Sequence, residues 1–178
     1  MTTEYLFTSA RLGFRQWIET DIPLMAAINA DREVMEYFPA TQDQQQTAAF
    51  ISRMQQQMAD KGYCYYAVDV LADGAFIGFI GLSDKTFEAS FTPCVDIGWR
   101  LGRSAWYNGY ATEGAKRCLK YGLNELQLGF ICSMAPKVNK RSEHIMQKIG
   151  MQKLGEFTHP LLADDERLRE CVVYKTID

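Results

Sequence analysis

Residues Cys94 to Ala115 read Cys-Val-Asp-Ile-Gly-Trp-Arg-Leu-Gly-Arg-Ser-Ala-Trp-Tyr-Asn-Gly-Tyr-Ala-Thr-Glu-Gly-Ala. The first third of this stretch alternates apolar residues with Asp, Gly and Arg, the period of a β-strand, and a helical pattern begins at Tyr110. The turn Asn108-Gly109 joins them, and its glycine allows the backbone to approach a ligand. Because a helix N-terminus attracts anions, this order predicts a phosphate or pyrophosphate site. The spacing alone also fits an ordinary tight turn.

The remaining chain supplies strands and helices in an order typical of a mixed sheet. Alternation and turn signals predict strands at 11–17, 63–71, 75–82, 94–101, 130–134, 151–158 and 170–175. Helical spacing predicts helices at 21–30, 32–37, 110–124 and 139–149, together with a Gln-rich helix that starts at Thr41 as N-cap and closes at Gly62. Strands first, then strands alternating with helices, indicate an α/β (α+β) fold with a mixed, mostly antiparallel central sheet flanked by helices.

Composition narrows the class of protein. The chain has 178 residues, of which 47% are hydrophobic, and this suits one domain over 1–178 with a sizeable core. A net charge of -3 without a basic stripe argues against nucleic acid as a partner. The longest apolar stretch, 75–82, is far short of a membrane span, and the N-terminus lacks the pattern of a signal peptide. We therefore expect a cytoplasmic protein.

The cysteines and histidines show no ligand spacing. Five cysteines are scattered singly and the chain has only two histidines, so we expect neither a disulfide framework nor a metal site. We interpret each cysteine as a core residue. These residues are Cys64, Cys94, Cys118, Cys132 and Cys171.

Two blocks of the chain resemble a known family. Arg103, Trp106 and the run from Asn108 to Glu113 resemble the acyl-CoA loop of the GNAT (Gcn5-related) N-acetyltransferases, in particular the branch that acetylates ribosomal-protein N-termini. Downstream, an Asn-x-x-Ser helix start at 139–142 and the ending Lys-Ile-Gly-Met at 148–151 are similar to the second signature of that branch. The resemblance covers nearly the whole chain. One loop position departs from it, since Tyr107 stands where glycine is common.

The resemblance implies a GNAT acyl-CoA N-acyltransferase fold and acetyl-CoA as the donor, with coenzyme A as product. In that family the strand holding Trp99 and the strand holding Met134 splay apart at the cofactor cleft. The pantetheine arm, which carries two amides, can then pair with free backbone groups near Trp99 and Leu101. The expected cofactor-binding residues are Trp99, Leu101, Trp106, Asn108, Gly109, Tyr110, Ala111, Thr112, Asn139 and Ser142.

Asp96 and Ser142 are the candidate catalytic residues. Asp96 lies on the strand that resembles the family's substrate-facing one, and burial would raise its pKa toward that of a useful general base. It is equally well a structural carboxylate paired with Arg100 on the same face. Many GNAT enzymes carry a tyrosine acid where this chain has Met146, so the resemblance implies Ser142 as the contact for the thioester sulfur; the alternative is a plain helix-surface serine. Asn139 fits both an N-cap and a pantetheine contact.

The predicted activity is direct transfer of acetyl from acetyl-CoA to a primary amine. A protein or peptide N-terminal amine is the leading acceptor by branch, and a polyamine, amino acid or aminoglycoside remains open, because acceptor pockets use variable loops such as 31–41. An alternative of another class is a catalytically silent acyl-CoA-binding module. An acidic loop at 164–166 would attract a cationic amine. We expect a monomer or homodimer.

Overall fold

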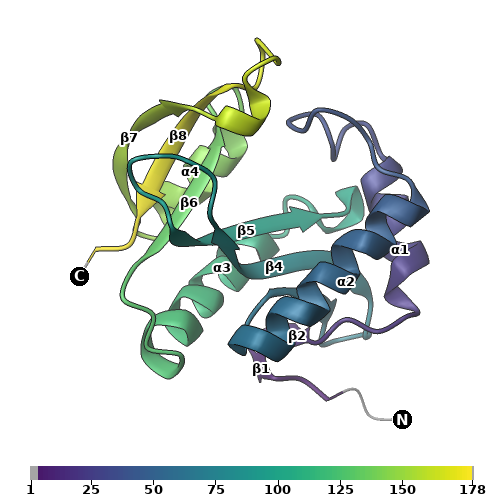
Figure 1. The fold of residues 1–178 in the computed structure, drawn as a ribbon. Helices are drawn as coiled ribbons and strands as arrows, with labels where there is room; N and C mark the ends of the chain where they lie inside the picture. Colours follow the sequence, from purple (N-terminus) through teal and green to yellow (C-terminus); the bar gives the residue numbers. More distant parts are fainter. Residues whose placement is uncertain (1–3, 178) are drawn as a thin grey trace.

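The computed structural model describes residues 4–177, and these contain an eight-stranded sheet (Figure 1). In chain order the strands are β1 (Phe7–Thr8), β2 (Leu12–Arg15), β3 (Tyr65–Val70), β4 (Phe76–Lys85), β5 (Cys94–Leu101), β6 (Ile131–Pro136), β7 (Gln152–Thr158) and β8 (Glu170–Lys175). Across the sheet they follow the order β1-β2-β3-β4-β5-β6-β8-β7. All neighbours are antiparallel except β5 and β6, which run parallel. The predicted mixed, mostly antiparallel sheet is confirmed.

Four helices flank this sheet: α1 (Asp21–Ala30), α2 (Gln44–Lys61), α3 (Tyr110–Lys120) and α4 (Lys140–Lys148). The bounds of α1 are those predicted, and Gly62 closes α2 in the left-handed conformation as expected. The prediction of Thr41 as N-cap is wrong. Asp43 caps α2 instead, because Gln46 three residues later returns a hydrogen bond and completes a capping box. None of the helices in residues 4–177 has both the length and the apolar character needed to cross a membrane.

Two other helix predictions need correction. Residues 32–37 form turns and not a helix, because so short a segment cannot hold a continuous series of helical hydrogen bonds: its backbone bonds, from Met35 to Asp31 and from Phe38 to Met35, are separate turns. The predicted helix 110–124 is α-helical only to Lys120 and continues as a π-helical turn, Tyr121–Glu125. The five cysteines are all buried and free, as expected for core residues.

The two faces of the central strands are covered by different helices (Figure 1). Side chains alternate across a strand, so Phe79 and its ladder partner Arg100 share one face, while Ile80 and its partner Trp99 share the other. Phe79 packs against Phe50 of α2, with ring centroids 5.3 Å apart. Ile80 packs against α3, where its Cδ1 would lie 2.3 Å from a Cβ on Gly114. Helices α1 and α2 therefore cover one face and α3 covers the opposite one.

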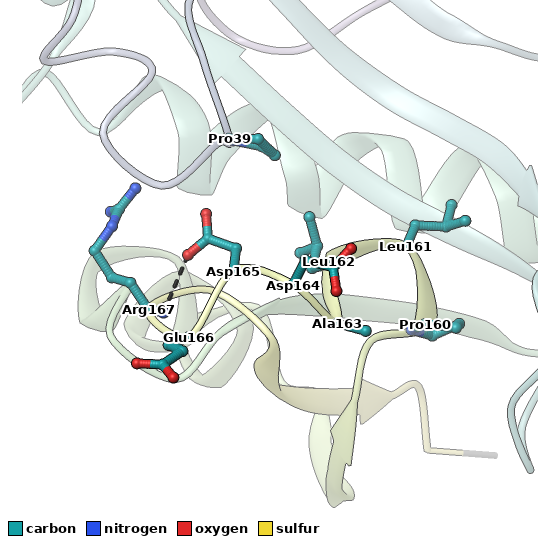
Figure 2. Close-up of a pocket in the computed structure, with 9 residues that line it drawn as sticks. All are labelled: Pro39, Pro160, Leu161, Leu162, Ala163, Asp164, Asp165, Glu166 and Arg167. Atoms are coloured by element: carbon teal, nitrogen blue, oxygen red, sulfur yellow. Dashed lines mark hydrogen bonds between the residues drawn. The ribbon is translucent and has the colours of Figure 1, made fainter.

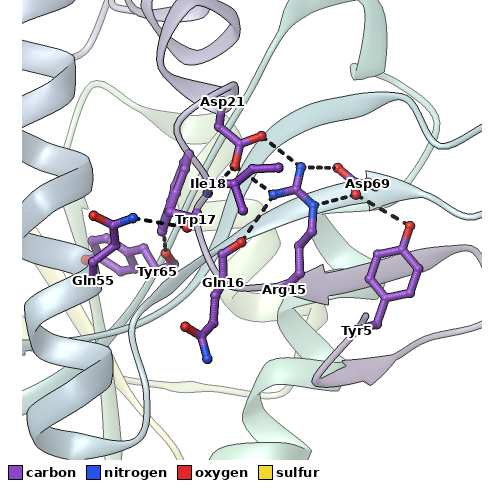
Figure 3. A network of polar contacts seen from close by, with 9 residues as sticks. All are labelled: Tyr5, Arg15, Gln16, Trp17, Ile18, Asp21, Gln55, Tyr65 and Asp69. Atoms are coloured by element: carbon purple, nitrogen blue, oxygen red, sulfur yellow. Dashed lines mark hydrogen bonds and ion pairs between the residues drawn. The ribbon is translucent and has the colours of Figure 1, made fainter. Parts of the chain in front are cut away.

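A buried ion cluster joins β2, β3 and α1 near the first of these faces (Figure 3). Arg15 is 7% exposed and forms two-pronged hydrogen bonds with both Asp21 and Asp69 at 2.7–2.9 Å. A fifth bond runs to the Gln16 carbonyl at 3.2 Å. Burial alone would lower the pKa of Arg15, but the hydrogen bonds and charges of the two carboxylates raise it above its ordinary value.

Candidate active site

The sheet opens between β5 and β6, and this opening holds the site. Their parallel pairing covers only Val95 with Ile131 and Asp96 with Cys132, after which the strands diverge. A cavity of about 300 Å³ lies at the divergence, lined by both strands, α4, the segment 37–38 and parts of α2, β3 and β4. The predicted splay is thus present. Four of the predicted site residues line this cavity, namely Asp96, Trp99, Asn139 and Ser142.

Asp96 is buried at the closed end of the splay, with 4% of its surface exposed. Its Oδ2 accepts a hydrogen bond from the Tyr65 hydroxyl at 2.5 Å, and its Oδ1 has no partner of good hydrogen-bond geometry in residues 4–177. Burial raises the pKa of Asp96 to about 6, although the charge of Lys85, the Tyr65 hydroxyl and the Met134 backbone act in the opposite direction. No ion pair joins Asp96 to Arg100 within the described chain. The expected structural pairing is therefore wrong.

Tyr65 is a site residue that the sequence did not single out. Burial and the neighbouring Asp96 raise the pKa of the Tyr65 phenol well above its ordinary value, so the phenol stays protonated and donates to the carboxylate. Gly98 makes this contact possible, because a Cβ there would lie 3.0 Å from the Tyr65 hydroxyl and 3.1 Å from its ring. Lys85 places its ammonium group 5.0 Å from the centre of the same ring. The proximity of these residues could have been predicted only from the register of the strands.

The side of β5 that faces away from β4 has backbone groups that are available to a ligand, with one exception. Gly102 donates its N–H to the Ile77 carbonyl. Because hydrogen-bonded pairs alternate along an antiparallel ladder, the backbone N–H and C=O groups of Arg100 and Gly98 also point toward β4, and those of the odd-numbered residues of β5 point away from it. Trp99 and Leu101 therefore direct their backbone groups to the open side, as the prediction required. However, the Trp106 indole N–H already donates to the Leu101 carbonyl at 2.8 Å. The Leu101 carbonyl is not free, which corrects the expectation for that residue.

The loop before α3 has the backbone of an anion site. Gly109 lies in the left-handed region (φ 78°), and no side chain caps α3. The first N–H groups of the helix, which include those of Tyr110, Ala111 and Thr112, consequently lack a side-chain acceptor. Tyr107 has φ 61°, a left-handed conformation that glycine would adopt without strain, and its side chain is 89% exposed. The loop therefore has the same kind of turn although tyrosine replaces the usual glycine. Asn108 braces the turn by donating its amide to the Trp106 carbonyl at 3.0 Å.

Two arginines beside this loop were also missed by sequence reasoning. Arg11 pairs with Glu113 at 2.7 Å and stacks 4.7 Å above the Tyr110 ring. Arg141 lies 5.3 Å above the Trp106 ring. Both cations add positive potential next to the helix N-terminus, which suits a pyrophosphate.

Helix α4 forms the wall of the cavity opposite β5. Asn139 caps it by accepting the Ser142 backbone N–H at 3.1 Å, so its predicted capping role is confirmed. The Asn139 and Ser142 side chains are partly exposed to the cavity. Met146, one turn later, is 1% exposed and has no proton to donate. Ser142 is thus the hydroxyl that α4 presents to the cavity.

A second hollow of about 570 Å³ lies apart from the splay cavity (Figure 2). It is formed by Pro39 and the loop 160–167, which carries the predicted acidic residues 164–166. Arg167 ties the two segments together by donating to the Glu36 carbonyl. Because Tyr37 and Phe38 line the splay cavity and Pro39 lines this hollow, a continuous stretch of chain separates the two spaces.

The cavity in a splayed sheet, next to an uncapped helix start, is the arrangement of a GNAT acetyltransferase. The chain belongs to that family: the acetyltransferase (GNAT) domain matches residues 11–152. A curated relative, the uncharacterized protein YkkB of Bacillus subtilis, is 32% identical over 121 residues, which cover 68% of this chain and 69% of that protein. The chain is an N-acetyltransferase, and enzymes of this family take acetyl from acetyl-CoA.

Solved structures share the fold over almost the whole length. A GNAT-family acetyltransferase from Bacillus anthracis is 25% identical, with a TM-score of 0.79 and 96% of each chain covered. RimL, a ribosomal L7/L12 alpha-N-protein acetyltransferase solved in complex with coenzyme A, has a TM-score of 0.76 at 15% identity, with 98% of each chain covered. The second likeness concerns the fold alone.

Proposed function

We propose that this chain transfers acetyl directly from acetyl-CoA to the N-terminal amine of a protein or peptide. The observation that carries the proposal is the splay cavity, where a buried carboxylate with a raised pKa faces an open strand edge beside an uncapped helix start. Bound acetyl-CoA would supply an activated thioester. Its pyrophosphate fits the N–H groups at Tyr110 to Thr112, and its pantetheine amides fit the backbone of Trp99, the Leu101 N–H and the Asn139 amide.

Asp96 is the proposed general base. A free α-amine has a pKa of about 8, so at neutral pH a large share is protonated and must lose a proton before it reacts. With a pKa of about 6, Asp96 is ionised at neutral pH and can accept that proton, directly or through one water. Its unpartnered Oδ1 is the oxygen that remains for this role, since Oδ2 is held by Tyr65.

Ser142 is the proposed contact for the departing sulfur. Its backbone N–H is held by Asn139, whereas no hydrogen bond of its hydroxyl to another described residue is found. The hydroxyl is therefore available to donate toward a thiolate from the wall opposite β5. The buried Met146 cannot take this part.

A peptide acceptor is supported by the hollow beside Pro39, which follows the segment 37–38 of the cavity wall. This space of about 570 Å³ lies next to the segment that lines the cavity and leaves room for chain beyond the reacting amine. RimL, a ribosomal L7/L12 alpha-N-protein acetyltransferase, has the same fold. A polyamine, amino acid or aminoglycoside is the alternative acceptor, and a silent acyl-CoA-binding module is the alternative without catalysis.

The first test is calorimetric titration with acetyl-CoA, with acetate and adenosine diphosphate as controls. Binding with about one site is expected, and Gly109→Ala should weaken it roughly tenfold, equivalent to about 1.4 kcal/mol. Gly62→Ala is a matched control, because Gly62 (φ 79°) has the same backbone conformation far from the loop, with nothing within 4 Å of an added Cβ. Failure of the wild type to bind would contradict the proposal. Binding without any peptide-dependent release of coenzyme A would favour the silent module.

A further inference from the structure

Arg100 stands in the splay cavity with few partners for its charge. Its Nη1 donates to the Asn29 Oδ1 at 2.7 Å, and its Nε is buried with no partner within residues 4–177. Two rings complete its surroundings, with the guanidinium carbon 4.1 Å from the centre of Phe38 and 5.4 Å from that of Phe79. No carboxylate of the described chain lies within ion-pair distance. The cation is thus held mainly by one neutral amide and two aromatic faces.

This arrangement leaves a charge without its counter-charge. Burial lowers the pKa of Arg100 to about 10, so the side chain remains positive at neutral pH. A cation removed from water is costly unless it is paired and hydrogen-bonded. Asn29 is itself fixed, because its amide donates to the Thr47 hydroxyl at 2.9 Å and its side chain is wholly buried. The guanidinium is therefore preorganised in the cavity, with unused donors.

We propose that Arg100 binds a carboxylate of the acceptor, so that the enzyme selects amines that carry a negative group on the same molecule. This inference rests on the proposed function, because it assumes that the acceptor occupies the cavity that Asp96 and Arg100 both line. A carboxylate there supplies the charge and the hydrogen-bond acceptors that the described chain does not, and arginine matches its planar geometry.

The spacing of the two residues favours a peptide with an acidic side chain. Asp96 and Arg100 are four residues apart on one face of β5, which separates their Cα atoms by about 13 Å along the strand. An amine near Asp96 and a carboxylate at Arg100 are then several bonds apart. A glutamate or aspartate at the second or third position of a peptide provides that distance better than the carboxylate of a free amino acid. The peptide side chain and the free amino acid both present a carboxylate, and experiment can distinguish them.

The experiment uses probes that differ only in a carboxylate. Peptide amides with glutamate at position two or three are compared with twins that carry glutamine, and L-alanine is compared with L-alaninamide. We expect the glutamate peptides to have a kcat/KM about tenfold to a hundredfold higher than their twins, as for a hydrogen-bonded charge pair. Arg100→Gln should abolish this preference and Arg100→Lys should restore part of it. Preference in the alanine pair instead would assign the site to free amino acids.

Two controls separate this inference from its alternatives. Arg53→Gln removes an exposed arginine of α2 and should leave the preference unchanged. If Arg100→Gln lowered kcat/KM equally for glutamate and glutamine peptides, Arg100 would only brace Phe38, and the inference would fail; equal use of both twins by the wild type would also overturn it. Peptide binding is measured separately by calorimetry with coenzyme A present. A preference seen there without acetyl transfer would sustain the anion site and reject the proposed activity.

Discussion

Two arginines of this protein, the buried Arg15 and the half-buried Arg100, have opposite surroundings. Arg15 donates five hydrogen bonds, four of them to two carboxylates, and joins β2, β3 and α1 (Figure 3). Arg100 has one hydrogen bond to a neutral amide and a buried Nε without a partner in the described chain. The first arrangement leaves nothing for a ligand to add. The second leaves a donor that no described residue satisfies.

The difference shows how stability and function are divided across the sheet. Around Arg15 each charged group has an opposite charge within hydrogen-bond distance, and loss of Arg15 would leave two buried carboxylates without a cation. In the cavity, Asp96 and Arg100 share one strand face but do not pair, and each keeps an unsatisfied atom. Incomplete satisfaction of buried polar groups is unusual, and two of the four such side-chain atoms found in residues 4–177 belong to this cavity; the others are Gln42 Oε1 and the Tyr66 hydroxyl.

The largest effect is expected at the ion cluster. Arg15→Met removes the cation and leaves Asp21 and Asp69 buried against each other, so the free energy of unfolding should fall by about 3–5 kcal/mol. Urea unfolding of the variant measures this change. Arg53→Met is the control at an exposed position and should stay within about 0.5 kcal/mol of the wild type. A loss as small as that of the control would mean that the cluster is not a structural element.

The next effect is on catalysis. Asp96→Asn keeps the shape of the side chain but removes the base, and turnover at neutral pH should fall about 100-fold with little change in acetyl-CoA affinity. The wild-type rate should rise as pH increases through about 6, because Asp96 must lose its proton to act, and rise again as the amine deprotonates. The variant should retain only the upper step. An unchanged rate and pH profile would remove Asp96 from the mechanism.

Arg100 should behave unlike Arg15 when stability is measured. Arg100→Met removes one hydrogen bond and two ring contacts but also relieves an unpaired charge, so the free energy of unfolding should change by no more than about 1 kcal/mol. The same urea titration that is used for Arg15 tests it. A loss as large as that of Arg15→Met would show that the fold depends on both arginines, and the contrast drawn above would be lost.

The smallest effect is expected in the loop before α3. Tyr107 has a positive φ and a fully solvated side chain, so Tyr107→Gly relieves backbone strain of about 1 kcal/mol while it increases the freedom of the unfolded chain by a similar amount. Thermal unfolding should therefore change little, and acetyl-CoA affinity should be retained. A clear loss of affinity would mean that the tyrosine ring itself contacts the ligand.

Local sequence signals predicted most of the fold. The strand 94–101 and the helix 21–30 have the predicted bounds, because alternation and helical spacing are strong in both. Predictions failed where a segment is too short to hold a continuous series of helical hydrogen bonds, as at 32–37, or where the better capping pair lay two residues away, at Asp43 and Gln46. Such choices depend on individual hydrogen bonds rather than on pattern.

The candidate site was predicted only in part. Motif residues on β5 and α4 do meet at one cavity, but Tyr65 and Lys85 enter it from positions with no local signal, and Arg100, predicted only as a partner of Asp96, does not pair with it. Their roles arise from strand register and from the lack of a partner, and neither property is written in a short stretch of sequence. The use of the Leu101 carbonyl by the Trp106 indole is likewise a tertiary contact.

Gly98 links two distant positions of the chain. A Cβ at position 98 would lie 3.0–3.1 Å from the end of the Tyr65 side chain, so the tyrosine that donates to Asp96 would have to shift by a few tenths of an ångström to make room for it. Residues 65 and 98 are therefore not free to diverge independently during evolution. Among relatives that retain an acid at the position of Asp96, an aromatic residue at 65 should be accompanied by glycine at 98, and a larger residue at 98 by a smaller one at 65.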